Sequence, residues 1–201
     1  MIKNIVFDVG NVLVYGTTKD ILYKFGLDES ELKMVMDTFI ADYRSLDFGE
    51  KTIKEYFDSF NYSNEFKQKY ENYFIHYYEY RELNKELLNL IPVLKNNGYN
   101  VYLLSDNNKE AIEYWYNLPE FSNVDGYVVS SDYKEVKRDK KLFDIFFEKY
   151  NLVPAECYFV DDKSINIEVA KEFNMEAFQY ASDKDDLKNL ITDMKDKGIN
   201  I

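Results

Sequence analysis

The chain has 201 residues, of which 46% are hydrophobic and 17% aromatic, and its formal net charge is −12. This composition excludes an intrinsically disordered chain, and the length suits one domain or one core with an inserted segment. The acidic balance argues against binding to duplex nucleic acid or to an anionic membrane surface, because both require clustered Lys and Arg.

The sequence also gives no sign of a membrane or secretory address. It contains no run of 18 apolar residues, and residues 1–8 lack the apolar core of a signal peptide. Its single cysteine, Cys157, cannot form an internal disulfide. Together these features favour the cytoplasm, and they leave the oligomeric state open.

Five short, β-rich apolar segments are predicted to be strands, and helical patterns separate most of them. They span residues 2–9, 100–104, 126–130, 157–160 and 177–180. Strands that alternate with helices form parallel sheets whose crossover helices cover the faces. We therefore expect an α/β fold with a Rossmann-like, doubly wound parallel sheet.

The long interval between the first two strands has a different character. Residues 17–81 show helical patterning and no strand pattern, and Asp28 and Thr52 each precede a Glu by three residues, as in a capping box. A crossover needs only one helix, so we expect an inserted small α-helical cap. The expected domains are a core of residues 1–16 and 82–201 and a cap of residues 17–81, with Gly16 and residues 83–84 as hinges.

Three further helices are predicted in the core. The first covers residues 87–97, and Pro92 within it should start a new turn or kink the helix. A second begins after Lys140. The last places its apolar residues between 187 and 194 on one face, with Ser182 as a candidate N-cap.

Polar side chains follow the predicted strands at their carboxyl ends, where open parallel sheets bind ligands. These are Asp8 after the first strand, Ser105 and Asp106 after the second, Lys137 after the third, and Asp161 and Asp162 after the fourth. Carboxylates, a hydroxyl and an ammonium group should therefore meet at one edge of the sheet.

The chemistry of this set is coherent. Clustered carboxylates repel one another unless a cation lies between them, and an all-oxygen set favours Mg²⁺ over zinc. The Asp8 carboxylate can attack a bound phosphate and form an aspartyl-phosphate that water then hydrolyses. Ser105 can donate a hydrogen bond to a phosphate oxygen, and Lys137 can offset developing charge. These residues predict a Mg²⁺-dependent phosphohydrolase that acts on a small phosphorylated metabolite.

In this arrangement the sequence resembles the haloacid dehalogenase (HAD) superfamily over nearly its whole length. The four motifs of the family are similar to residues 8–12 (DVGNV), Ser105, Lys137 and residues 161–166 (DDxxxN), in that order. The helical insertion resembles the C1-type cap of the family. The opening FDxGNV, the Ser-Asp pair at 131–132 and FxDDxxxN resemble bacterial sugar-phosphate phosphatases such as α-D-glucose-1-phosphate phosphatase.

The resemblance implies a role for each matched residue. Asp8 would be the nucleophile and a metal ligand, with Asp162 and the backbone carbonyl of Gly10 as further ligands. Phosphate would be bound by Ser105, Asp106 and Lys137, of which Lys137 is also catalytic. Asp161 would position Lys137, and Asn166 would support the shell around the metal.

Three positions depart from the family pattern. Gly10 stands where most HAD phosphatases carry an Asp that acts as general acid/base and typically contributes ~10²–10⁴-fold, so turnover should be slow or the proton should come from water or substrate. Asp106 replaces the usual Asn, and its charge should weaken phosphate binding unless it points away. Arg138 replaces the usual Pro, which keeps three neighbouring lysines open as alternatives to Lys137: Lys134, Lys140 and Lys141.

The alternatives are a catalytically weak or inactive HAD-like protein that binds a metal or metabolite, a 2-haloacid dehalogenase and a phosphomutase. The three departures favour the first. A dehalogenase needs no metal, so the pair Asp161-Asp162 argues against it, and a phosphomutase lacks a proton-transfer group at Gly10. Cys157 and His76 are expected to be structural.

Overall fold

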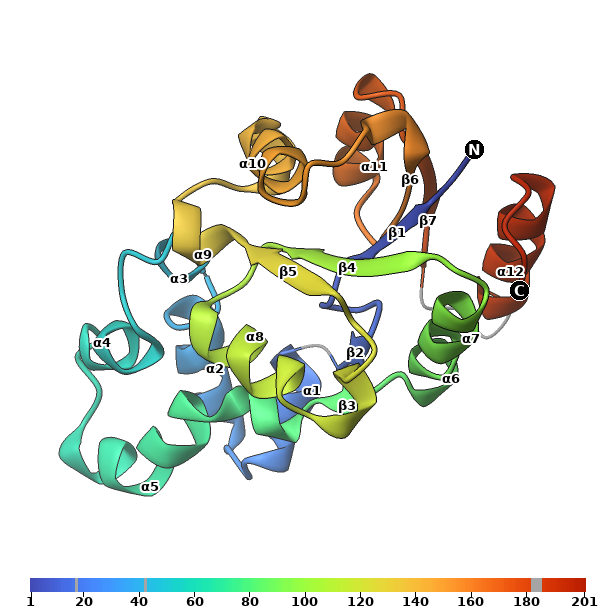
Figure 1. Ribbon diagram of the computed structural model, residues 1–201. Helices are drawn as coiled ribbons and strands as arrows, with labels where there is room; N and C mark the ends of the chain where they lie inside the picture. The colour runs from blue at the N-terminus through green and yellow to red at the C-terminus, as the bar shows by residue number, and fades with distance from the viewer. Residues whose placement is uncertain (17, 42, 182–185) are drawn as a thin grey trace.

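The computed structural model describes residues 1–16, 18–41, 43–181 and 186–201, without the side chains of residues 18–20 (Figure 1). Its centre is a five-stranded sheet in the order β5-β4-β1-β6-β7, and every neighbouring pair is parallel. The strands are β1 (Asn4–Phe7), β4 (Asn100–Ser105), β5 (Gly126–Val129), β6 (Cys157–Asp161) and β7 (Glu176–Gln179). The five predicted strands are confirmed, with bounds close to those expected.

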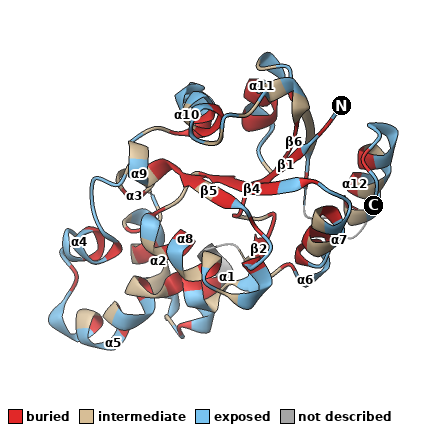
Figure 2. Ribbon diagram, in the orientation of Figure 1, coloured by how far each residue is buried: buried red, intermediate tan, exposed pale blue. Residues whose placement is uncertain are grey.

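Helices cover both faces of this sheet, as Figure 1 shows. On one face lie α10 (Lys141–Tyr150) and α11 (Ser164–Glu172), and on the other lie α7 (Leu90–Asn96), α8 (Lys109–Tyr116) and α12 (Asp186–Asp196). Alternate residues of β1 enter different cores: Val6 packs in the core that contains Phe146, and Ile5 in the core that contains Ile91. The strands β1, β4, β5 and β6 are almost entirely buried between these layers, whereas the edge strand β7 is only partly covered (Figure 2). The doubly wound fold is therefore confirmed.

The described part of the stretch between β2 (Val14–Tyr15) and β3 (Glu82–Leu83) consists of short helices joined by loops and contains no strand. Both expected capping boxes are present, with Asp28 at the start of α2 and Thr52 at the start of α4. Aromatic rings pack in the interior of this segment, among them Phe39, Phe57 and Phe74. Its elements are α1 (Thr18–Lys24), α2 (Glu29–Asp37), α3 (Arg44–Asp47), α4 (Ile53–Asp58), α5 (Asn64–Ile75) and the 3₁₀ helix η1 (Tyr77–Tyr80).

The strands β2 and β3 pair antiparallel, with Val14 opposite Leu83. They have two residues each, which is too short to produce a periodic pattern, and the sequence analysis missed them. Asn84, directly after β3, donates a hydrogen bond from its side chain to the Val12 carbonyl oxygen at 2.8 Å. The two ends of the helical segment are thereby fixed together, close to the loop that follows Asp8.

The remaining helices agree with the sequence patterns. The predicted helix around Pro92 is divided into α6 (Lys85–Leu88) and α7 at Asn89, because proline has no N–H for the hydrogen bond that would join them. The candidate N-cap Ser182 lies outside the described residues. Short helical turns complete the core: η2 (Pro119–Phe121), α9 (Ser130–Tyr133), η3 (Lys137–Asp139) and η4 (Pro154–Glu156). In the described part of the chain, no helix has the length and apolarity needed to cross a membrane.

Candidate active site

The central strand β1 brings the candidate site together. Its neighbours are β4 and β6, so the carboxyl ends of all three strands lie at one edge of the sheet, where the strand order reverses. The Asp8 N–H donates to the Val160 carbonyl oxygen at 2.8 Å, which continues the ladder one residue beyond β1. Asn11 then adopts a left-handed conformation with φ of 58°, which turns the chain back over this edge.

Three carboxylates and one ammonium group meet there. Asp8, Asp161 and Asp162 each offer an oxygen within 4.8 Å of the others. The Lys137 Nζ lies 2.8 Å from Asp8 Oδ1 and 2.6 Å from Asp161 Oδ2, and its side chain is only 1% exposed. The structure therefore brings residues from three different strand ends into one buried charged cluster.

Within the cluster, the two adjacent aspartates have different surroundings. Asp161 Oδ1 accepts hydrogen bonds from the Lys163 backbone N–H and the Asn166 amide, and Oδ2 from Lys137 and the same amide. Asp162 Oδ2 accepts one hydrogen bond from the Asn11 amide at 3.1 Å, whereas its buried Oδ1 has no donor among the described residues. Asp161 is saturated by protein donors, and Asp162 keeps an oxygen for another ligand.

The charges in the cluster shift its titration. Burial raises the pKa of the Asp8 carboxyl to about 7, since the opposing effect of Lys137 is offset in part by Asp161 and Asp162. Burial alone would lower the pKa of the Lys137 ammonium, but the charges of Asp161, Asp8 and Asp106 raise it above its usual range. Lys137 is therefore a permanent cation in this cluster.

The carboxyl end of β4, with Ser105 as its last residue and Asp106 directly after it, lies next to the cluster. The Ser105 hydroxyl is buried and makes no hydrogen bond to a described residue. Asp106 Oδ1 accepts the backbone N–H of Lys137 at 2.9 Å. The carboxylate that replaces the expected amide thus fixes the start of η3, the turn that carries Lys137.

The alternative lysines lie elsewhere. Lys140 pairs with Glu172 and Lys141 with Glu135, both on the exposed surface, and Lys134 is exposed. The side chain of Arg138, where the family has Pro, is 58% exposed and 4.0 Å from Asp139. Of the candidate lysines, Lys137 is the one that the structure places against the aspartates.

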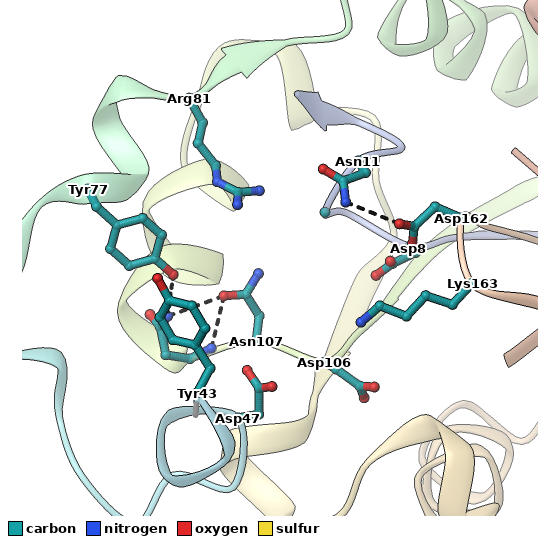
Figure 3. A pocket seen from close by; sticks show the side chains of 12 residues that line it. Asp8, Asn11, Tyr43, Asp47, Tyr77, Arg81, Asp106, Asn107, Asp162 and Lys163 are labelled. Atoms are coloured by element: carbon teal, nitrogen blue, oxygen red, sulfur yellow. Dashed lines mark hydrogen bonds between the residues drawn. The ribbon is translucent and has the colours of Figure 1, made fainter. Parts of the chain in front are cut away.

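A cavity of about 180 Å³ opens beside the cluster (Figure 3). Most of its lining was not predicted from the sequence, although Arg81 lies two residues before the predicted hinge at 83–84, and Asn107 and Asn108 come soon after the predicted strand 100–104. A hydrogen bond links two of its lining residues: the Asn108 amide donates to the Tyr77 hydroxyl at 2.8 Å. The lining combines Asp8, Gly10, Asn11, Asp106, Asn107, Asn108, Asp162 and Lys163 of the core with Tyr43, Asp47, Tyr77 and Arg81 of the helical segment and its end.

These residues fit a hard divalent cation. The donors are all oxygens, two of the carboxylates line the cavity, and the buried Asp162 Oδ1 is left without a protein donor. Clustered carboxylate oxygens of this kind suit Mg²⁺ better than a thiophilic metal. An ion at this position would also relieve the repulsion by Asp161 and Asp162, which adds to the effect of burial on the pKa of Asp8.

Cys157 and His76 contribute nothing to this chemistry. Burial raises the pKa of the Cys157 thiol to about 12, so the reactive thiolate is not populated. The His76 ring lies 3.1 Å from Glu79 on the surface of the helical segment and does not line the cavity. The structural role predicted for both residues agrees with these surroundings.

Comparison with known proteins extends this description. Residues 2–174 match the family model of the haloacid dehalogenase-like hydrolases. The chain is 28% identical over 197 residues to a D-ribitol-5-phosphate phosphatase of Bacteroides thetaiotaomicron, covering 89% of this chain and 92% of that protein.

Solved structures agree in fold. A HAD family enzyme of Bacteroides thetaiotaomicron, crystallised with magnesium and inorganic phosphate, superposes with a TM-score of 0.70 at 21% identity, covering 89% of this chain and 94% of that one. A HAD-like family hydrolase from Porphyromonas gingivalis gives a TM-score of 0.70 at 20% identity over 100% of both chains. The fold, the strand-end aspartates and the family match lead to one conclusion: the chain belongs to the haloacid dehalogenase-like hydrolases.

Proposed function

We propose that the protein is a Mg²⁺-dependent phosphatase that hydrolyses a small phosphorylated metabolite, with Asp8 as the nucleophile. The observation that carries this proposal is the contact of Lys137 Nζ with both Asp8 and Asp161, beside Asp162 Oδ1, for which the described residues offer no hydrogen-bond donor. A buried cation shared by two carboxylates orients one of them and leaves it close to a metal-binding oxygen. This arrangement suits attack by a carboxylate on a dianionic ester.

In this proposal Asp8, Asp162 and the Gly10 carbonyl hold Mg²⁺, which when bound neutralises charge on the phosphate and on the carboxylates. Asp161 serves Lys137 instead of the metal, because its oxygens already accept hydrogen bonds from three residues. Asn166, buried behind Asp161, supports that arrangement.

The residues of the chain would then act in two steps. A carboxylate oxygen of Asp8 bonds to phosphorus as the bond to the alcohol oxygen breaks, and water cleaves the resulting aspartyl-phosphate. Lys137 offsets the negative charge that gathers between nucleophile and phosphate. The Ser105 hydroxyl, which is buried and has no hydrogen-bond partner among the described residues, donates to a phosphate oxygen, while Asp106 contributes by holding the Lys137 backbone in place.

The lining of the cavity supports a substrate class. Its wall beyond the aspartates consists mainly of carboxylate, amide, phenol and guanidinium groups, which match the hydroxyls of a sugar or polyol. The similarity to a D-ribitol-5-phosphate phosphatase supports the same class. We infer a sugar phosphate or polyol phosphate as substrate, residues 17–81 as the cap that closes over it, and the cytoplasm as the compartment.

The competing activities receive less support. A 2-haloacid dehalogenase would use Asp8 without a metal, and the retained Asp162 carboxylate with its open oxygen would then have no role. A protein that binds metabolite without turnover remains the alternative that experiment must separate. Two of the three departures from the family pattern no longer favour this alternative. Asp106 holds the Lys137 backbone, and the Arg138 side chain is exposed to solvent.

The test is hydrolysis of p-nitrophenyl phosphate and a panel of sugar and polyol phosphates, with Mg²⁺ and with EDTA, by wild type and Asp8→Asn. We expect metal-dependent hydrolysis that the substitution abolishes. Asp58→Asn is the matched control, since that aspartate is exposed on α4 and pairs only with Lys54 among the described residues. Equal rates in wild type and Asp8→Asn would refute the proposal, and a wild type inactive on the whole panel would favour the binding protein.

A further inference from the structure

The cavity contains a cation that the mechanism above does not use. Arg81 lies between η1 and β3, and in Figure 3 its guanidinium group points into the cavity from the side opposite Asp106. Its Nε is buried, yet no described residue accepts a hydrogen bond from it. No ion pair of Arg81 occurs among the described residues. A guanidinium that faces a cavity beside carboxylates and has a buried Nε–H without an acceptor among the described residues is prepared for an anionic ligand.

The backbone of Arg81 is fixed relative to Asp8. The next two residues form β3, which pairs with β2, and β2 follows the loop that begins at Asp8. Asn84 strengthens this connection, because its backbone N–H donates to Leu13 O at 2.9 Å and its amide to Val12 O. The backbone of Arg81 is therefore held by the same small sheet that follows the Asp8 loop, although Arg81 and Asp8 are far apart in sequence.

Gly10 has no side chain that would fill the space between Asp8 and Arg81. A Cβ added at Gly10 would lie 4.0 Å from Arg81 Nη1, its nearest non-neighbouring atom. An acidic side chain at this position would reach the guanidinium and pair with it. With glycine present, the donors of Arg81 remain available to whatever occupies the cavity next to Asp8.

The direction of attack indicates which atom Arg81 meets. Lys137 approaches Asp8 from the buried side, within 2.8 Å, and the nucleophile and leaving oxygen must lie roughly in line on opposite sides of phosphorus. The leaving oxygen is then turned away from Asp8 and into the cavity, where the guanidinium lies. Building on the proposed phosphatase function, we propose that Arg81 is a catalytic residue that hydrogen bonds to the leaving-group oxygen.

The step balances without a protein acid. As Asp8 Oδ bonds to phosphorus, the electron pair of the P–O bond passes to the departing oxygen, and the Arg81 N–H groups stabilise its charge. Arginine does not release its proton, so the alkoxide takes a proton from water, and the hydroxide so formed is neutralised in solvent. This role would account for turnover in a chain that has glycine at position 10.

The test compares phenyl phosphates whose leaving phenolates differ in basicity, from p-nitrophenyl phosphate to unsubstituted phenyl phosphate, in wild type, Arg81→Gln and Arg81→Lys. We measure kcat/KM, which reports formation of the aspartyl-phosphate. For Arg81→Gln we expect kcat/KM for phenyl phosphate to fall by about 10²–10³-fold. The fall for p-nitrophenyl phosphate should be smaller by a factor of roughly five or more, because its phenolate needs less stabilisation. Arg81→Lys, which keeps the charge, should show a weaker dependence on the leaving group.

Lys163→Gln is the matched control, because it removes another cation that lines the cavity; its loss should be the same for every ester in the series. A uniform loss with Arg81→Gln would overturn the inference, since Arg81 would then only bind phosphate. A dependence on the leaving group that appears in Asp47→Asn and not in Arg81→Gln would overturn it as well. In both cases a metal-dependent wild type that Asp8→Asn inactivates would leave the proposed function standing. If Arg81→Gln fails to fold, Arg81→Lys is compared with Lys163→Gln instead, and an Arg81→Lys loss that is the same for every ester would overturn the inference.

Discussion

At the scale of single residues, Asp8, Lys137 and Asp161 form one buried charged cluster, which carries the chemistry in the proposed function. Lys137 is buried between two carboxylates, and such an ion is stabilised only while its partners remain. Replacing one partner leaves an uncompensated buried charge. Replacing both members of a pair removes their interaction but leaves no such unpaired charge. The contribution of each residue therefore depends on the others.

This dependence gives a test by double-mutant cycle in metal-free protein. Lys137→Gln should lower the free energy of unfolding by about 3–5 kcal/mol, because two buried carboxylates lose their cation. Lys137→Gln with Asp161→Asn should cost clearly less than the sum of the two single changes. Urea denaturation measures all three, with the exposed Lys140→Gln as control. Additive effects would mean that the two side chains do not interact as the structure shows.

The raised pKa of Asp8 gives a second residue-scale prediction, on pH. Its pKa is about 7 in the folded protein, against 3.8 for the ordinary group. The folded state therefore binds more protons than the unfolded state between about pH 4 and pH 7, and stability falls as pH rises through this range.

The measurement is the free energy of unfolding of wild type and Asp8→Asn in EDTA at several pH values. We expect wild type to lose stability relative to Asp8→Asn from pH 4 to pH 7, by on the order of 1 kcal/mol per pH unit. Saturating Mg²⁺ should abolish the difference in slope, because the ion favours the carboxylate. Parallel curves in EDTA would show that Asp8 titrates normally.

At the scale of elements, the helical segment packs very closely against the core at Gly49. Gly49, with φ of 61°, lies so near α9 that an added Cβ would be 2.2 Å from the Ser131 carbonyl oxygen. The Ile53 N–H, at the start of α4, also donates to Glu110 of α8. If residues 17–81 act as a cap, these contacts define its closed position.

Gly49→Ala tests that idea, because the methyl group cannot fit against a backbone carbonyl and should hold the segment away from the core. We expect KM to rise by roughly tenfold or more, with a larger radius of gyration in solution scattering. Gly26→Ala is the matched control: Gly26 also has a positive φ, of 74°, but an added Cβ meets nothing within 4 Å. Both variants bear a similar backbone strain of about 1–2 kcal/mol, so equal KM values would contradict the closed-cap interpretation.

The elements also show what the sequence can and cannot predict. The apolar strands of the main sheet, the capping boxes and the helix break near Pro92 depend on local patterns, and the structure confirms them. The pair β2 and β3 depends on contacts between residues about 70 positions apart, such as Asn84 with Val12, and has no local pattern. For the same reason, strand ends identified the aspartates, Ser105 and Lys137, whereas the cavity residues Arg81 and Tyr77 became apparent only in three dimensions.

At the scale of the whole molecule, a chain with a net charge of −12 keeps a cluster of carboxylates at the edge of its sheet. Self-repulsion in this cluster lowers the stability of the metal-free protein, and a bound divalent cation relieves it. Ligands that bind only the folded state stabilise it by mass action. Binding of the metal should therefore raise the free energy of unfolding even without substrate.

We expect Mg²⁺ at a hundred times its dissociation constant to raise the free energy of unfolding by about 2.7 kcal/mol. Asp162→Asn should remove most of this gain, whereas Asp58→Asn should retain it. Thermal denaturation over a Mg²⁺ titration measures the effect. A gain that is unchanged in Asp162→Asn would place the ion elsewhere on this acidic protein.

The most direct test of the proposed function is to identify the group that carries the phosphoryl intermediate. Wild-type protein turning over a phosphate ester with Mg²⁺ is quenched in acid and reduced with borohydride, which converts an aspartyl-phosphate to homoserine, and the peptides are sequenced by mass spectrometry. We predict homoserine at position 8, dependent on substrate and absent from Asp8→Asn. Sustained turnover with the phosphoryl group on another residue, or on none, would contradict the central role of Asp8.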